Sequence, residues 1–144
     1  LRVGTVRKSS SILADQSEKL QSGLNFDLMA GLVDITEKFC SELPESTETL
    51  GSLLTESWGL KTKLAEGITN EEIENALLSA VGFGATGGKL LGAGHSGYIL
   101  LVFPDRSSRG EYIEQLPNKS AIIVPRIDND GCKVIFRSEQ HGAS

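Results

Sequence analysis

The sequence predicts an α+β domain in which helices cover one face of an antiparallel or mixed sheet. In the first half of the chain, apolar residues recur at the spacing of amphipathic helices. After about residue 84 the pattern changes to short apolar runs separated by turn residues, which is typical of strands. The chain has 144 residues, the size of one domain. We therefore expect one domain over residues 1–137 and a flexible tail over residues 138–144.

The chain opens with a predicted strand followed by a predicted helix. Leu1–Val6 is short, apolar and rich in β-branched residues. One of the serines at 9–11 can cap the helix that follows, and Gly23 ends it. The apolar face of this helix is expected to contain Ile12, Leu13, Gln16 and Leu20.

Two longer helices are predicted next. The second helix covers about Phe26–Leu43, and Pro44 stops it. Its apolar stripe is Met29, Leu32, Val33, Thr36, Phe39, Cys40 and Leu43. The third helix begins near Ser46 and is closed by Gly67. Its stripe is Leu50, Leu53, Leu54, Trp58, Lys61 and Leu64.

The fourth helix is predicted from a capping box. Thr69 to Glu72 fits the pattern in which the acidic side chain reaches back to the amide of the capping residue. Gly82 or Gly84 then terminates the helix. Its buried stripe is expected to contain Ile73, Ala76, Leu77 and Ala80.

The second half of the chain predicts four strands and one helix. Strands are expected over Lys89–Leu91 and Tyr98–Phe103, on either side of a glycine-rich turn. A short helix follows over Ser107–Leu116. The last two strands are expected over Ala121–Val124 and Cys132–Phe136. The sequence Asp-Asn-Asp-Gly over residues 128–131 is a strong hairpin signal between them.

The glycine-rich stretch of residues 84–97 does not fit the familiar nucleotide-binding motifs. A phosphate-binding P-loop would need a glycine at Phe83 and a hydroxyl residue at Leu90. The spacing G-x-G-x-x-G occurs at residues 82–87 and again at residues 92–97. That dinucleotide motif must open a helix, whereas a strand follows the second match.

Composition argues against several classes of protein. The net charge of −5 gives no electrostatic support for nucleic-acid binding. No apolar run is long enough for a membrane span and no signal-peptide pattern opens the chain, so we expect a cytoplasmic protein that binds neither nucleic acid nor membrane. Cys40 and Cys132 are expected to be reduced, buried thiols. Neither His95 nor His141 has metal ligands at suitable spacing, so no metal site is expected.

Three segments together resemble a known family. Val3–Gln16, Leu53–Lys61 and Gly87–Gly94, in this order, resemble the C-terminal half of GHMP-family small-molecule kinases. The resemblance is nearest to the sugar kinases that act on D-glycero-D-manno-heptose 7-phosphate, and it covers residues 1 to about 136. It implies the fold of a GHMP kinase C-terminal domain, with a ferredoxin-like antiparallel sheet covered by helices on one face.

The resemblance also implies where substrate binds. It places a glycine-rich active-site loop at Gly92, Ala93, Gly94, Ser96 and Gly97. Substrate-binding side chains are then expected at Arg7, Lys61, Lys89 and His95. Each has a structural alternative: an arginine at a strand end, a surface lysine, an edge-strand lysine and an exposed turn histidine. The glycines of this loop have a structural alternative too, because they could serve only to form a tight helix-to-strand connection and a hairpin. The heptose branch usually has three glycines where this chain has His95-Ser96-Gly97.

The expected activity follows from the resemblance. The complete enzyme would use ATP and Mg²⁺ to phosphorylate a heptose phosphate or a related sugar. The family's ATP phosphate loop and proposed acidic base belong to an N-terminal domain and have no counterpart here, so this chain alone is expected to be inactive and to carry no cofactor. The expected partners are a sugar phosphate, a fused or separate N-terminal kinase domain, and a second copy in a homodimer. The alternative is a non-catalytic, small-molecule-binding or regulatory module.

Overall fold

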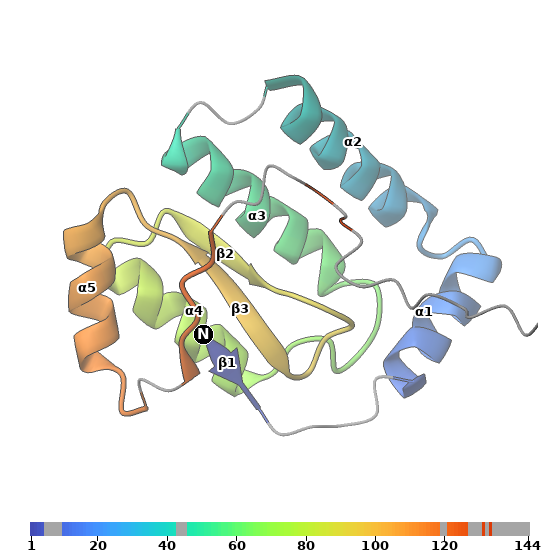
Figure 1. The fold of residues 1–144 in the computed structure, drawn as a ribbon. Helices are drawn as coiled ribbons and strands as arrows, with labels where there is room; N and C mark the ends of the chain where they lie inside the picture. The colour runs from blue at the N-terminus through green and yellow to red at the C-terminus, as the bar shows by residue number, and fades with distance from the viewer. Residues whose placement is uncertain (5–9, 43–45, 119–120, 127–130, 132, 134–144) are drawn as a thin grey trace, which may run out of the picture.

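The fold contains five helices and a three-stranded antiparallel sheet, which confirms the predicted α+β class. The computed structural model describes residues 1–4, 10–42, 46–118, 121–126, 131 and 133. Figure 1 shows the helices α1 to α4 preceding most of the sheet in the chain, and α5 following it. None of the helices in these residues is both long and apolar enough to cross a bilayer.

The sheet has the order β1-β3-β2, so the strand that comes last in the chain is central. Strand β1 (Arg2–Val3) pairs with β3 (Gly97–Val102), placing Arg2 opposite Tyr98. Strand β2 (Gly87–Leu90) pairs with the other edge of β3, placing Leu90 opposite Ile99. These three strands confirm the predicted sheet segments within a few residues, although β1 is shorter than expected over the residues that the structure describes.

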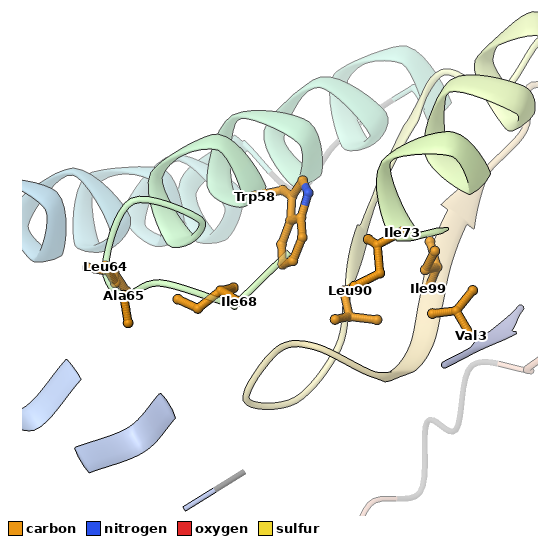
Figure 2. Close-up of a cluster of buried hydrophobic side chains, with 8 residues drawn as sticks. All are labelled: Val3, Trp58, Leu64, Ala65, Ile68, Ile73, Leu90 and Ile99. Atoms are coloured by element: carbon orange, nitrogen blue, oxygen red, sulfur yellow. The ribbon is translucent and has the colours of Figure 1, made fainter. Parts of the chain in front are cut away.

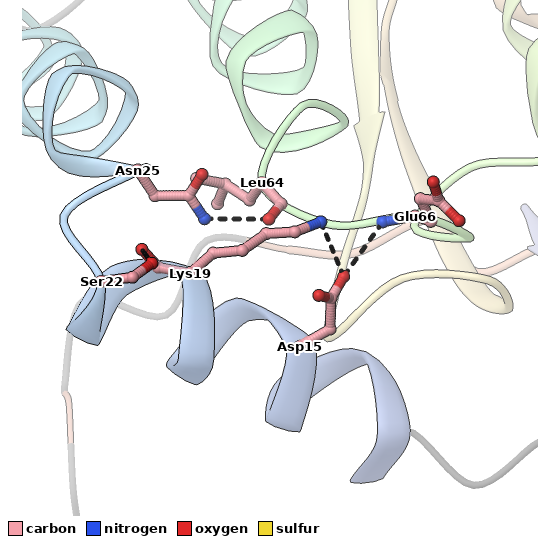
Figure 3. Close-up of polar contacts among 6 residues, drawn as sticks. All are labelled: Asp15, Lys19, Ser22, Asn25, Leu64 and Glu66. Carbon is pink, nitrogen blue, oxygen red and sulfur yellow. Dashed lines mark hydrogen bonds and ion pairs between the residues drawn. The ribbon is translucent and has the colours of Figure 1, made fainter.

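Helix α1 (Ser10–Gln21) is fastened by polar contacts to the segment that follows α3 (Figure 3). Asp15 Oδ2 accepts hydrogen bonds from Lys19 Nζ at 3.0 Å and from the backbone N of Glu66 at 3.3 Å. Asn25, only 4% exposed, donates from Nδ2 to the carbonyl oxygen of Leu64 at 2.9 Å. A buried amide without such a partner would be costly, so this bond helps to fix the connection between α1 and α2.

Helix α2 (Phe26–Glu42) buries a different face from the one predicted. Ile35 is buried, and Leu28 and Leu32 pack against the main core. The other predicted stripe residues with described side chains are exposed, and they are Met29, Val33, Thr36, Phe39 and Cys40. The helix is apolar on two adjacent sides, so periodicity alone could not decide which side packs. The expectation of a buried Cys40 thiol was therefore wrong, while Cys132 lies outside the described residues.

Helix α3 (Thr47–Lys61) begins where the sequence predicts. Ser46 is its N-cap, and the hydroxyl of Ser46 accepts a hydrogen bond from the backbone N of Thr49 at 3.1 Å. The predicted end at Gly67 was wrong, because the helix ends at Lys61. The chain then turns through residues 62–68.

The cap of helix α4 (Glu71–Gly82) also differs from the prediction. Asn70, not Thr69, is the N-cap, and its Oδ1 accepts from the backbone N of Ile73 at 3.1 Å. The carboxylate of Glu72 is used elsewhere, because it accepts from the backbone N of Gly4 at 2.9 Å. The predicted capping box is thus replaced by a contact between the start of α4 and the end of β1.

Helix α5 (Arg106–Gln115) confirms the last predicted helix. Asp105 caps it, accepting from the backbone N of Ser108 at 2.9 Å. The strand predicted over Ala121–Val124 was wrong: Ala121 is in a 3₁₀ turn and residues 122–126 have no regular secondary structure. This segment instead lines a cavity with β3 and α5, so its apolar side chains are explained without strand pairing.

The other C-terminal predictions fall mostly outside the described residues. These are the strand Cys132–Phe136, the hairpin turn at residues 128–131 and the tail 138–144; of them only Gly131 and Lys133 are described.

The core consists of two clusters. The larger cluster, drawn in Figure 2, combines residues from α3, α4, the sheet and the segment 62–68; it contains Val3, Trp58, Leu64, Ala65, Ile68, Ile73, Leu90 and Ile99. The smaller cluster contains Ala80, Ala85 and Tyr112. The ring of Tyr112 lies 5.9 Å from that of Phe83 and 5.6 Å from that of Phe103, measured between centroids. These rings hold α5 against α4 and β3.

Candidate functional site

The turn between β2 and β3, residues Leu91–Ser96, is tied to the chain just before α4. The backbone N of His95 donates to the carbonyl oxygen of Ile68 at 2.7 Å. The carbonyl oxygen of His95 accepts from Asn70 Nδ2 at 2.8 Å. Since Asn70 also caps α4, the position of this β2–β3 turn is coupled to the start of a helix. The turn is therefore anchored on one side by backbone and side-chain contacts.

Two glycines divide the β2–β3 turn into a packed side and an open side. Gly94 is buried, and a Cβ placed on it would lie 2.8 Å from the Cα atom of Ile68. Gly92 is exposed, and a Cβ placed on it would have no neighbour within 4 Å. Gly94 thus serves close packing, whereas Gly92 leaves its backbone accessible to a ligand.

One lysine contacts the open side of this turn, and a second lysine lies near the first. Lys61, the last residue of α3, donates from Nζ to the carbonyl oxygen of Gly92. Lys89 lies on β2 and donates from Nζ to the hydroxyl of Ser57 at 2.6 Å. We call Lys61 and Lys89 the lysine pair. It lies near the C-terminal end of α3, where the helix dipole favours positive charge.

The charge of the lysine pair is poorly compensated. Burial lowers the pKa of Lys61, and the nearby charge of Lys89 lowers it further. Burial also lowers the pKa of Lys89. Lys19 forms an ion pair with Asp15, whereas neither Lys61 nor Lys89 has an acidic partner in any ion pair found among the described residues. Two partly buried ammonium groups without a counter-charge form a place where an anion would be stabilised.

The close packing of α3 on β2 brings the lysine pair together. A Cβ on Gly87 would lie 2.1 Å from the carbonyl oxygen of Gly51, so the helix and strand backbones touch at this point. The hydroxyl of Thr55 accepts from the backbone N of Gly88 at 3.3 Å. Helix α3 therefore covers the outer edge of β2, and Lys89 reaches across that edge toward α3.

The remaining predicted site residues have different positions. Arg7 lies outside the described residues. His95 has a left-handed backbone with φ of 67°, and its imidazole takes part in none of the hydrogen bonds found in the described part of the chain. Ser96 lies against Gly4, since a Cβ on Gly4 would come within 2.8 Å of the Ser96 Cβ. Ala93 lies in the turn and Gly97 is the first residue of β3, and both are partly exposed.

Two residues of this site were not predicted from the sequence. Ser57 holds the ammonium group of Lys89, and Asn70 holds the carbonyl group of His95. Ser57 precedes Lys61 by one helical turn, so Ser57 and Lys61 share a face of α3. That spacing could have suggested Ser57, whereas nothing local connects Asn70 with the turn. In the residues that the structure describes, no group of three or more His, Cys, Asp or Glu side chains could hold a metal ion.

Comparison with known protein families shows which family the region around this candidate site resembles. A family model described as "GHMP kinases C terminal" matches residues 35–122. The matched region includes the lysine pair, the β2–β3 turn and helices α3 to α5. No curated protein matches the chain.

Proposed function

The chain belongs to the GHMP kinases as a C-terminal domain, and we propose that it forms the substrate-binding side of a sugar phosphate kinase. In this proposal, the lysine pair and the open side of the β2–β3 turn face a cleft that the domain shares with an N-terminal kinase domain. The substrate is a heptose phosphate or a related sugar phosphate, as the resemblance of the Trp58–Lys61 segment to the heptose branch suggests.

The observation that carries the proposal is the uncompensated charge of the lysine pair. A phosphate group brought beside Lys61 and Lys89 would supply the negative charge that these residues lack among their described neighbours. Hydrogen bonds between ionised partners are stronger than neutral ones. Ser57 and the carbonyl group of Gly92 already orient the two ammonium groups, so little side-chain freedom remains to be lost on binding.

The reaction would need groups that the lysine pair does not provide. Phosphoryl transfer depends on positioning and on stabilising charge around the moving group. ATP would supply that phosphoryl group, and Mg²⁺ would neutralise phosphate charge. The lysine pair would hold the anionic end of the sugar by point charges and keep protons on both Nζ atoms. The N-terminal domain, fused or separate, would supply the ATP phosphate loop, so we expect no phosphoryl transfer by this chain alone.

Titration with sugar phosphates tests the proposed site. D-glycero-D-manno-heptose 7-phosphate and D-mannose 6-phosphate would be added to the labelled chain, followed by amide NMR. We expect saturable shifts at Gly92 and its neighbours. The double variant Lys61→Gln/Lys89→Gln should bind about tenfold more weakly or worse, because charged hydrogen bonds are lost. The matched control is Lys63→Gln, which removes an exposed lysine from the same region. Equal binding by the double variant and the control would contradict the proposal.

A second experiment separates the kinase from a non-catalytic binding module. The chain would be combined with a GHMP N-terminal domain and assayed for transfer from ATP to the sugar phosphate that it binds. Restored transfer supports the kinase. Sugar phosphate binding that depends on the lysine pair, without transfer in any such combination, would favour the binding module instead.

A further inference from the structure

A cavity that is separate from the lysine pair lies between α3 and α4, beside the start of β2. Its volume is about 180 Å³. Neither the lysine pair nor the β2–β3 turn contributes to its walls, which include Thr55, Trp58, Leu77, Leu78, Val81 and Gly88. We propose that this cavity binds a small, uncharged and mostly apolar molecule whose single hydrogen-bond acceptor is recognised by the indole N–H of Trp58.

The unpartnered donor of Trp58 is the first reason. Trp58 is only 5% exposed, and its Nε1 is buried without a hydrogen-bond partner among the described residues. Native proteins rarely leave a buried donor unsatisfied, because its hydration is lost without replacement. In Figure 2 the nitrogen lies on the side of the ring toward α4, the helix that forms the other wall of the cavity. The donor therefore indicates that an acceptor belongs in this space.

The other wall residues indicate which kind of ligand would fit this cavity. Leu77, Leu78 and Val81 provide an apolar surface from α4. The hydroxyl of Thr55 is already engaged, because it donates to the carbonyl oxygen of Gly51 at 2.9 Å and accepts from the backbone N of Gly88. The one ionisable wall residue is Glu74, whose carboxylate accepts from the hydroxyl of Thr69. A negative wall disfavours anions, so the ligand differs in charge from the sugar phosphate of the proposed function.

The size and opening of the cavity fit one small ring. An apolar cavity of about 150 Å³ is large enough for benzene. This cavity has about 180 Å³ and also offers one polar donor. Leu78 is 68% exposed and Val81 is 57% exposed, so the side chains of α4 form an accessible mouth. A ring with one carbonyl, ether or aza group can therefore enter and place its acceptor at the indole.

Cyclohexanone and methylenecyclohexane provide a matched pair of probes. They have the same shape, but only the ketone carries an acceptor. Trp58 is the single tryptophan of the chain, so its indole N–H gives one assignable NMR signal. We expect cyclohexanone to shift this signal downfield in a saturable manner and to bind about fivefold more tightly than methylenecyclohexane. The proposal would be overturned if neither probe bound, or if both bound equally without an indole shift. It would also be overturned if bound water were the only partner of the indole N–H.

Two variants test the location and the donor. Val81→Phe should narrow the mouth and abolish cyclohexanone binding, while Ser79→Phe adds the same ring at an exposed position outside the cavity. Trp58→Phe retains an aromatic side chain but removes the donor, so thermal stabilisation by the ketone should fall to that given by the alkene. Unchanged ketone binding in Val81→Phe, or a retained ketone preference in Trp58→Phe, would contradict the assignment. Sugar phosphate binding, measured in parallel, reports on the lysine pair independently.

Discussion

The glycines at the start of β2 and those in the β2–β3 turn are close in sequence but meet different surroundings. At the start of β2, a Cβ on Gly87 would lie 2.1 Å from the carbonyl oxygen of Gly51. In the turn, a Cβ on Gly92 would meet nothing within 4 Å. The first glycine allows two backbones to touch, while the second leaves its own backbone open beside Lys61.

The glycine-rich stretch therefore has no single role. The glycine at the start of β2 is required by packing, whatever ligand the protein binds. Gly94 is intermediate, because it belongs to the turn but is buried against Ile68. The open side around Gly92 is the part of the turn that we propose for ligand binding. Substitutions in the two regions should therefore separate stability from binding.

Gly87→Ala should have the largest effect on stability. The new Cβ would collide with the backbone of α3, which cannot move aside as a flexible side chain could. Overpacking usually costs 1–3 kcal/mol, and we expect about 3 kcal/mol of lost unfolding free energy here. Urea denaturation followed by Trp58 fluorescence measures it. A loss below about 1 kcal/mol would show that α3 and β2 are not in the close contact described.

Gly51→Ala and Gly59→Ala compare two glycines within α3. A Cβ on Gly51 would lie 2.4 Å from Thr86, so we expect a loss of about 2 kcal/mol. A Cβ on Gly59 would have no neighbour within 4 Å, so alanine there should raise stability by about 0.5–1 kcal/mol through helix propensity. The same denaturation assay reports both variants. If both substitutions changed the unfolding free energy equally, the close contact between Gly51 and Thr86 would be contradicted.

Gly94→Ala and Gly92→Ala make the comparison within the turn. The first should cost about 2 kcal/mol and move the turn away from Ile68, because the new Cβ would come within 2.8 Å of the Ile68 Cα. The second has open space but a left-handed φ of 88°, so we expect a cost of about 1 kcal/mol. Amide NMR of His95 would show whether its bond to Ile68 persists. If the His95 amide signal moved equally in both variants, the claim that the turn has a packed side and an open side would be wrong.

The lysine pair predicts a pH dependence. Burial lowers the pKa of both lysines in the folded protein, so the unfolded chain binds more protons at alkaline pH. Stability should therefore rise as pH increases through the lowered pKa values toward the unfolded value near 10.5. Lys61→Met/Lys89→Met should show a smaller rise than the control Lys63→Met in urea denaturation between pH 8 and 10. Parallel curves for the two variants would count against the desolvated lysine pair.

His95→Gly should have the smallest effect. Glycine relieves the left-handed backbone of residue 95 but increases the entropy of the unfolded chain, so the net change should stay within about 1 kcal/mol. If the imidazole only occupies the turn surface, sugar phosphate affinity should also be unchanged. Affinity that falls about tenfold would instead assign a binding role to the side chain of His95.

Local signals in the sequence determined most of the secondary structure. Ser46 caps α3, and the change of apolar period at the glycine stretch marks the start of the β2–β3 hairpin, because these features depend on neighbours along the chain. The glycine turn also led to the candidate site, whose binding role stays a prediction. Lys61 and Lys89 could be named from the resemblance, although nothing local indicated that they lie together.

Which face of each helix is buried depends on packing between segments that are distant in the sequence. Met29 and Leu32 have similar local patterns, yet only Leu32 packs on the core, since the neighbouring elements choose the buried side. Glu72 binds Gly4 rather than its own helix cap for the same reason. The meeting of α3 and β2 at Gly51 and Gly87 brings Lys89 to Ser57 and Lys61 to the turn. Such contacts depend on the packing of distant segments, which the spacing of residues along the chain does not encode.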